Sequence, residues 1–395
     1  MRDWKMTTIA ECSTILGDGL HGTPKYDENG EYAFINGNNL HSGRIVIKPD
    51  TKRVGLSEYE KHKKELTDRT VLVSINGTLG NVAVYNGEKV ILGKSACYFN
   101  VSADCDVQFM RYVVSSPRFQ QYINSVATGT TIKNVSLKQM REYSFPIPEL
   151  TEQQRIAKVL HLLDQKIENN RKINDNLYAQ ARAIANRWIT ENDSDYELLP
   201  LSEVATINPD TYSPKEEWEY VNYLDTSSIT DGYIADIQHI TPSTEKLPSR
   251  ARRIIASNDV VFSTVRPNQR HFGIISEPLP NMLASTGFAV IRSNNPLVCN
   301  ELIYLCLTDN AFVEKMQQLA EQSTSTFPSI KPSDLGVCEI PCPKDDFSSN
   351  LAETLKAMFA LIAANHRENA ALVELRDSLL PKLMSGEINV SDIQL

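Results

Sequence analysis

The run from Arg266 to His271 gathers side chains that can read nucleic-acid bases. Guanidinium and carboxamide groups form paired hydrogen bonds with base edges, and nearby cations neutralise phosphates. The run lies between two stretches rich in β-branched residues, so we expect it to form a turn between strands. We therefore predict that the polar members of this run contact DNA: Arg266, Asn268, Gln269, Arg270 and His271.

Several other predicted loops carry the same residue types. In the first half we predict DNA contacts from Asn38, Asn39, Lys52, Arg53, Lys61, Lys63, Lys64, Asn76, Thr78, Thr130, Thr131, Lys133 and Asn134. In the second half we add Arg250, Arg252, Arg253, Ser325 and Lys331. For each of these residues the alternative is a solvated loop without a partner.

Residues for catalysis or for a bound metal do not form a recognisable pattern. An adenine methyltransferase uses a glycine-rich cofactor loop and an Asn/Asp-Pro-Pro-aromatic motif, whereas Asn208-Pro209-Asp210 lacks the second proline and the aromatic residue. The sequence contains no Gly-x-x-x-x-Gly-Lys loop. The 7 cysteines include no Cys-x-x-Cys pair, and the 7 histidines are scattered. We expect no catalytic site, no bound cofactor or metal, and reduced thiols that are mostly buried.

The charge is unevenly distributed along the 395 residues. The whole chain has a net charge of −9, yet residues 1–150 hold 18 Lys and Arg against 16 Asp and Glu. Residues 193–346 hold 11 against 22. We expect this acidic segment to face a protein partner or solvent, while local basic loops contact DNA. With no apolar run of membrane-spanning or signal-peptide length, the expected location is the cytoplasm.

The two halves of the sequence follow one plan. Val135 corresponds to Ile330, and Phe145–Pro148 to Ile340–Pro343, both at an offset of 195 residues. Short strand-type runs fill the first part of each half, and a long helical pattern follows. We predict four segments: a first domain at 1–150, a first long helix with a linker at 151–192, a second domain at 193–346, and a second long helix with a tail at 347–395.

The two helical segments each carry a heptad seam. Thr151 and Gln154 suggest a capping box at the start of the first helix, and Asp346 a cap for the second. Both seams become polar at corresponding places. The predicted seam residues are Ile156, Leu160, Leu163, Ile167, Asn170, Asn174 and Leu177 in the first helix, and Leu351, Leu355, Met358, Ile362, Asn365, Asn369 and Leu372 in the second.

Pairing of the two helices would suit the reading of a linear polymer. We expect an α+β fold in which two mixed, strand-rich domains are joined by two long antiparallel coiled-coil helices, with a pseudo-two-fold repeat. The seam asparagines should then meet. Helices of about 40 residues are roughly 60 Å long. This length corresponds to at most about 18 base pairs of duplex DNA. Two related domains held apart in this way can read two separated stretches of duplex.

Motifs at both helices resemble one known family. The run from Phe145 to Ala157 is similar to the segment that opens the long helix of type I restriction–modification specificity subunits, and the run from Leu379 to Ile388 resembles the end of their second helix. The run from Ile75 to Tyr85 is similar to the strand–turn–strand in their domain core. The resemblance covers essentially the whole chain.

The resemblance implies a function for both domains and both helices. Each domain would be a target recognition domain that reads one half of a gapped DNA sequence, and the helices would dock two methyltransferase subunits carrying S-adenosylmethionine. Motor–nuclease subunits would join to make the cutting form. A coiled-coil scaffold without a DNA role, a subunit serving methylation only, and a single-chain enzyme are the alternatives. The sequence does not define the bases read or the gap length.

Overall fold

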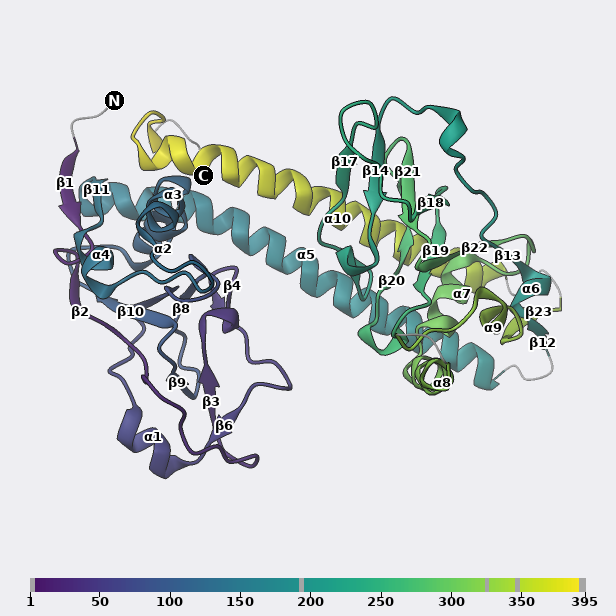
Figure 1. Cartoon of the computed structure of the whole chain (residues 1–395), viewed down its shortest axis with the longest axis horizontal. Helices are drawn as coiled ribbons and strands as arrows, with labels where there is room; N and C mark the ends of the chain where they lie inside the picture. Colours follow the sequence, from purple (N-terminus) through teal and green to yellow (C-terminus); the bar gives the residue numbers. More distant parts are fainter. Residues whose placement is uncertain (1–3, 192–194, 324–326, 345–348, 391–395) are drawn as a thin grey trace. The chain divides into compact units, whose positions relative to one another are not determined.

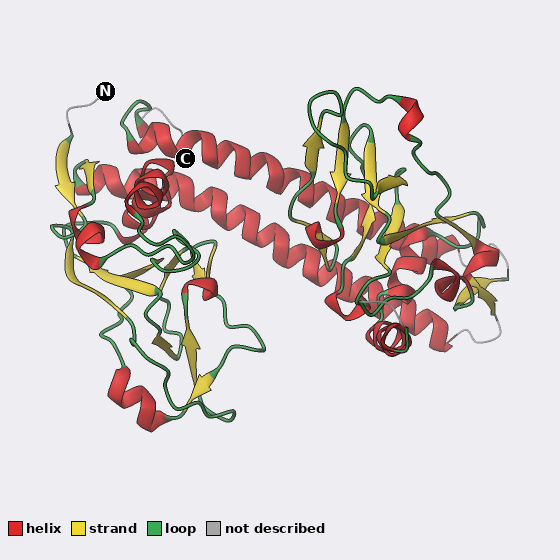
Figure 2. Ribbon diagram, in the orientation of Figure 1, coloured by secondary structure: helices red, strands yellow, loops and turns green. Residues whose placement is uncertain are grey.

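The computed structural model describes residues 4–191, 195–323, 327–344 and 349–390, and it forms two compact units. Unit 1 is made of Met1–Glu168 and Asn369–Leu395, and unit 2 is Asn169–Glu368. Each unit contains strands, short helices and part of both long helices (Figures 1 and 2). The predicted α+β class is confirmed. The borders predicted between domains and helices stay a prediction from sequence.

Unit 1 is built on a four-stranded sheet with smaller sheets beside it. Its two central strands are buried at every position, as expected for strands of a sheet that is covered on both faces. The four-stranded sheet has the order β2 (Ser13–Asp18), β10 (Ala96–Val101), β7 (Thr70–Ser74) and β8 (Val82–Val84). The smaller sheets are β6 (Arg53–Val54), β3 (Tyr32–Ile35) and β9 (Val90–Leu92); β1 (Lys5–Thr8) with β11 (Ser144–Ile147); and β4 (Leu40–His41) with β5 (Arg44–Ile45).

Short helices complete the domain of unit 1. They are α1 (Leu56–His62), α2 (Val107–Ser115), α3 (Pro117–Val126) and α4 (Leu137–Glu142). The break between α2 and α3 falls at Ser116. The Ser116 hydroxyl accepts a hydrogen bond from Phe119 N at 3.3 Å, and Pro117 occupies the first turn of α3. A proline has no N–H to donate, so it is favoured at a helix start and ends the preceding helix.

Unit 2 repeats this architecture. Its main sheet has the order β13 (Ala205–Ile207), β22 (Phe288–Ser293), β19 (Asp259–Ser263) and β20 (Phe272–Ile275). The other strands are β17 (Gln238–Ile240), β14 (Val221–Leu224), β21 (Met282–Ser285) and β18 (Ala251–Ile254) in one sheet; β12 (Tyr196–Pro200) with β23 (Glu339–Pro343); and β15 (Ile229–Thr230) with β16 (Tyr233–Ile234). The helices are α6 (Leu201–Val204), α7 (Asn300–Leu307), α8 (Asn310–Glu321) and α9 (Pro332–Gly336).

Strand pairings confirm the internal repeat. The first strand of each domain pairs with its last in an antiparallel way, β1 with β11 and β12 with β23. Each domain also contains one parallel pair, β3 with β9 and β14 with β21. The main sheets have the same strand order when read through the repeat. In both domains the last strand of this topology precedes a long helix.

The two long helices are α5 (Leu150–Glu191) and α10 (Ser349–Met384). The predicted capping box is wrong, because α5 begins at Leu150 and so Thr151 lies within its first turn. The incoming chain is held instead by buried Gln153, whose Nε2 donates to Pro148 O at 2.9 Å and whose Oε1 accepts from Asp106 N at 2.9 Å. The predicted cap Asp346 lies outside the described residues.

Within each unit the two helices run in opposite directions. In unit 2 the Asn365 Nδ2 donates to Asn174 Oδ1 at 2.7 Å, and Phe359, earlier in α10, contacts Tyr178, later in α5. The seam positions are buried or half-buried in both helices: Ile156, Leu160, Leu163, Ile167, Asn170, Asn174, Leu177, Leu351, Leu355, Met358, Ile362, Asn365, Asn369 and Leu372. The predicted meeting of seam asparagines is confirmed for Asn174 with Asn365. The Asn170 Nδ2 donates to Glu368 Oε2 at 2.7 Å.

Candidate nucleic-acid interface

In unit 1 two predicted contact loops are joined by hydrogen bonds. The first is the β7–β8 turn, residues 75–81, and the second is the α3–α4 loop, residues 127–136. Gly77 N donates to Lys133 O at 3.0 Å, and Val135 N donates to Ile75 O at 2.8 Å. The Asn76 Nδ2 also donates to Asn134 Oδ1 at 3.0 Å. We call this two-loop surface the first loop pair.

Unit 2 contains an equivalent second loop pair, made of residues 264–271 and 327–331. Arg266 N donates to Pro328 O at 2.9 Å, and Ile330 N donates to Thr264 O at 2.9 Å. The turn residue at the junction is left-handed in both units, with φ of +75° at Gly77 and +47° at Arg266. An arginine in this region is strained relative to glycine. The backbone geometry is thus repeated while the side chains differ.

The first loop pair presents polar side chains to solvent. Thr78, Thr130, Thr131, Lys133 and Asn134 are exposed, and Asn76 is half-buried. Hydroxyl, amide and ammonium groups of this kind can hydrogen bond to base edges and phosphates. The structure therefore brings together six of the residues predicted to contact DNA in the first half.

Asn38 and Asn39 lie in a short 3-10 helix, where Gly37 O accepts from the Asn81 Nδ2 of the first loop pair at 3.1 Å, and they differ in exposure. Asn38 is exposed, whereas Asn39 is 5% exposed. The Asn39 Nδ2 donates to Val46 O at 3.0 Å, and its Oδ1 accepts from Asn36 N at 3.0 Å. The Asn39 carboxamide therefore shapes the turn, and Asn38 is the member of the pair that faces solvent.

The basic cluster around α1 is partly neutralised by its own helix. Lys61 pairs with Glu58 at 2.8 Å and Lys63 with Glu60 at 2.6 Å, each three residues apart. Both lysines are exposed, and surface ion pairs of this kind contribute little to stability. The other predicted residues of this region are Lys52 and Arg53, which are exposed, and Lys64, which is half-buried.

In the second loop pair the two arginines have different environments. The Arg270 Nε donates to Asp231 at 2.6 Å and its Nη1 to Asn310 at 3.0 Å, and its guanidinium lies over the Phe272 ring. The Arg266 guanidinium lies over the Phe327 ring at 5.0 Å. Arg270 is therefore held by its own domain, and Arg266 sits at the junction of the two loops.

Other predicted residues of the second half have varied surroundings. Asn268 and Gln269 are exposed, as is Lys331, while the His271 Nδ1 lies 2.6 Å from Ile229 O. Ser325 lies outside the described residues. Asn268, Gln269 and Lys331 are the residues of this group best placed to meet a ligand.

The three arginines at β18 also differ. Arg250 is exposed, and Arg252 is half-buried with its Nε donating to Ser249 O at 3.1 Å. Arg253 is half-buried, and burial lowers its pKa from the ordinary value. Its Nη1 donates to Thr211 at 3.4 Å. Arg250 is therefore the member of this cluster most open to a phosphate.

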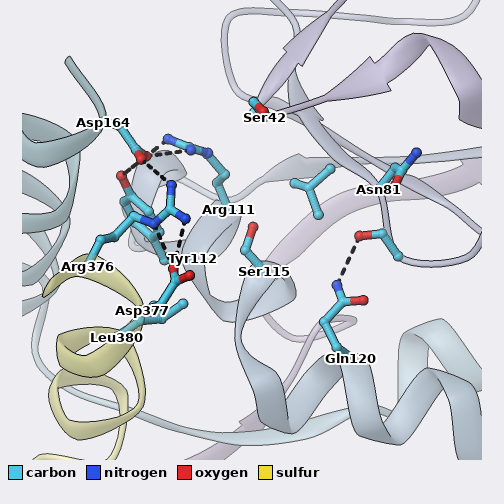
Figure 3. A pocket seen from close by; sticks show the side chains of 13 residues that line it. Ser42, Asn81, Arg111, Tyr112, Ser115, Gln120, Asp164, Arg376, Asp377 and Leu380 are labelled. Atoms are coloured by element: carbon cyan, nitrogen blue, oxygen red, sulfur yellow. Dashed lines mark hydrogen bonds and ion pairs between the residues drawn. The ribbon is translucent and has the colours of Figure 1, made fainter. Parts of the chain in front are cut away.

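Unit 1 also contains a pocket of about 250 Å³ beside the two long helices. Figure 3 shows Arg111 from α2 and Arg376 from α10 pointing toward Asp164 of α5. Arg111 Nη2 lies 2.6 Å and Arg376 Nη1 2.9 Å from the carboxylate, and the Tyr112 hydroxyl donates to it at 2.6 Å. This network ties the domain of unit 1 to both helices.

The Asp164 carboxyl is partly buried, which opposes its ionisation. Attraction by Arg111 and hydrogen bonds from Tyr112, Arg376 and Arg111 outweigh that effect, so the pKa of Asp164 is lowered. In unit 2, Phe359 follows Asp164 by 195 residues, and its ring contacts Tyr178 and Tyr304 with centroids 5.4 and 5.6 Å apart. The same position thus uses ionic contacts in one unit and aromatic packing in the other.

The described parts of the chain contain no group of three or more His, Cys, Asp or Glu side chains able to hold a metal. Of the seven cysteines, all are free thiols, and six of them are buried. No helix among the described residues is long and apolar enough to span a membrane. The prediction of free, mostly buried thiols is confirmed.

Comparison with known proteins agrees with the motifs of the long helices. Residues 1–179 match the family described as type I restriction modification DNA specificity domain. The first 179 residues therefore carry a domain of that family. The family resemblance inferred from the helix motifs is confirmed.

Similar proteins match this chain over its whole length or over part of it. It is 22% identical to the type I restriction enzyme MjaIX specificity subunit of Methanocaldococcus jannaschii, over 99% of this chain and 95% of that protein. It is 26% identical to a putative type I specificity subunit of Mycoplasma genitalium, over 54% of this chain and 55% of that protein. The crystal structure of a type I restriction–modification S subunit from M. genitalium has the same fold, with a TM-score of 0.57, 20% identity and 96% of both chains covered.

Sequence reasoning missed the ionic network around Asp164. Asp164 lies 53 residues after Arg111 and 52 after Tyr112, on a different helix, so no local motif marks the network. One sign was present, because Arg376 occupies a seam position where the first helix has Ala181. A long cation in an apolar seam requires a buried carboxylate nearby, and Asp164 is that partner.

Proposed function

We propose that the chain is the noncatalytic DNA-recognition and assembly subunit of a type I restriction–modification methyltransferase. The observation that carries this proposal is the repeated loop pair. Both domains support it with the same backbone hydrogen bonds, at Gly77 with Lys133 and at Arg266 with Pro328, but present different side chains. Two loop pairs with the same backbone and different polar side chains can bind two halves of one target that differ in sequence.

In this proposal each loop pair reads one half of a gapped duplex sequence. The two long helices dock two methyltransferase subunits, which carry S-adenosylmethionine and methylate adenine. Motor–nuclease subunits join to give the cutting form. The acidic segment 193–346 faces a methyltransferase subunit or solvent, so partner subunits supply much of the phosphate contact. The chain works in the cytoplasm, where its free thiols stay reduced.

A reconstitution with labelled S-adenosylmethionine tests this division of labour. The chain alone should transfer no methyl group to DNA, and the methyltransferase subunit alone should transfer little. The mixture should methylate DNA that contains the target. DNA binding by the chain alone should be weak and fall steeply with salt, because phosphate contacts release counterions. Methyl transfer by the chain alone, or an unchanged activity of its partner when the chain is added, would refute the proposal.

A further inference from the structure

Both loop pairs carry one exposed large apolar residue at the same place. The Ile132 residue is 59% exposed and Phe327 is 55% exposed, and they are 195 residues apart, at the offset of the repeat. The anchoring residues three positions later are buried, Val135 at 1% and Ile330 at 6%. Apolar character at the tip is therefore kept in both halves although the residue type differs.

The first tip is held rigidly. Thr128 N donates to Asn134 O at 2.9 Å and Asn134 N donates back to Thr128 O at 2.8 Å, which closes the loop around Ile132. Gly129 has a φ of +97°, and a Cβ there would lie 2.3 Å from Ile132 O. Only glycine fits this turn without strain. The apolar side chain is thus presented on a preformed loop.

The second tip is supported by the turn that faces it. The Arg266 guanidinium lies over the Phe327 ring at 5.0 Å, and the neighbouring Pro328 carbonyl accepts from Arg266 N at 2.9 Å. A ring packed in this way has few rotamers to lose when it binds a ligand. Lys331 and Asn268 of the same loop pair are exposed.

An apolar side chain among exposed donors and cations matches one way in which proteins contact bases. Apolar residues touch thymine methyl groups at a groove edge, or enter between base steps, while neighbouring polar groups hold the backbone. A protein-binding patch would instead depend on a continuous apolar surface. In the first loop pair Ile132 is flanked by exposed Thr131 and Lys133, which favours DNA.

We propose that Ile132 and Phe327 are specificity-determining residues that contact DNA bases, each in one half of the target. This inference rests on the function proposed above. Ile132 and Phe327 supply apolar contact with a base, and their polar neighbours contact phosphates. Because an apolar contact releases no counterions, it adds sequence preference without adding salt dependence.

The test uses the complex of this chain with its methyltransferase subunit, on a duplex that the wild-type complex methylates. The variants I132A and F327A should each weaken binding to this duplex by about 10- to 100-fold. The slope of affinity against salt and the affinity for unrelated duplex should not change. The variant K133A should weaken binding to both duplexes and reduce the salt slope by about one. The variant L198A removes an apolar side chain on β12 that is 53% exposed, and it should bind as the wild type does.

The fluorescence of 2-aminopurine, substituted for each adenine of the duplex in turn, distinguishes two modes of base contact. A fluorescence rise that is lost in F327A or I132A indicates insertion between base steps, and no rise with a lost preference for thymine indicates a groove-edge contact. Either result supports the inference.

Two outcomes overturn the inference. Wild-type affinity and unchanged methylated sequence in both alanine variants would show that these residues do not contact bases, while the proposed function would stand. Loss of the complex in size-exclusion chromatography would show that the tips bind protein. Failure of the wild-type complex to prefer any sequence would instead refute the proposed function itself.

Discussion

The Asn365 side chain donates a hydrogen bond to Asn174 across the helix pair of unit 2, at 2.7 Å, and both residues are at least 90% buried. The Asn174 Nδ2 also donates to Ile362 O at 3.4 Å. A buried amide pair in an apolar seam favours the register in which the two amides meet. Two like helices from one repeat could otherwise pair in several registers.

We predict that N365A lowers the free energy of unfolding by about 1–3 kcal/mol, because Asn174 would keep a buried amide without its partner. The double variant N174L/N365L should recover most of that loss, since both polar groups are removed. Urea denaturation measures the free energy of unfolding of both variants. The control is N186A, which changes an exposed asparagine of α5 and should shift stability by less than about 0.5 kcal/mol. An N365A protein as stable as the wild type would contradict the role of the pair.

The second prediction concerns the Asp164 network. The D164N variant should lower the free energy of unfolding by about 3 kcal/mol, because Arg111 and Arg376 lose a shared, mostly buried carboxylate. The E353Q variant removes the carboxylate of an exposed pair with Lys356 and should change stability by less than about 0.5 kcal/mol. Equal stability of the D164N protein and the wild type would mean that the network does not hold the helices to the domain.

The third prediction is a loss of stability in mild acid. The pKa of His161 is lowered, first by burial and then by Arg111, and the pKa of His366 is lowered by burial and then by Arg171. The unfolded chain binds a proton at each histidine near pH 6.5, whereas the folded chain does so only at lower pH. This contribution is therefore fully present above about pH 6.5 and is lost as the pH falls toward the lowered values.

Urea midpoints at pH 7.5, 6.0 and 5.0 measure this effect. The variants H161L and H366L should each have a flatter profile than the wild type between pH 7.5 and 5.0. Asp164 has a lowered pKa and stays ionised over this range, so its contribution is lost only in stronger acid. Profiles that are unchanged in both leucine variants would show that other groups cause the acid sensitivity.

The fourth prediction separates reading from support within the second loop pair. Asn268 and Gln269 are exposed, so N268A/Q269A should alter the bases required in one half of the target and change stability by less than about 0.5 kcal/mol. Arg270 bonds Asp231 and Asn310, so R270A should cost about 1 kcal/mol of stability. The methylated sequence and urea midpoints distinguish the two effects. An unchanged sequence in N268A/Q269A would remove this turn from the reading surface.

The sequence was sufficient for features that depend on local periodicity. The heptad pattern located the seam residues and predicted that seam asparagines meet, as Asn174 and Asn365 do, and the offset of 195 residues identified corresponding loops. It did not predict that Gly77 and Lys133 would be joined, because a backbone hydrogen bond between loops 56 residues apart leaves no side-chain pattern. The buried role of Asn39 was missed for a similar reason, since exposed and turn-forming asparagines look alike in sequence.

Base-resolution mapping of methylated adenines tests the central claim most directly. Cells would express the methyltransferase subunit with this chain, without it, and with the N268A/Q269A variant. We predict a gapped two-part sequence that appears only with the chain, and a variant that changes one part while the other is kept. Methylation of the same sequence with and without the chain would contradict its role in DNA recognition.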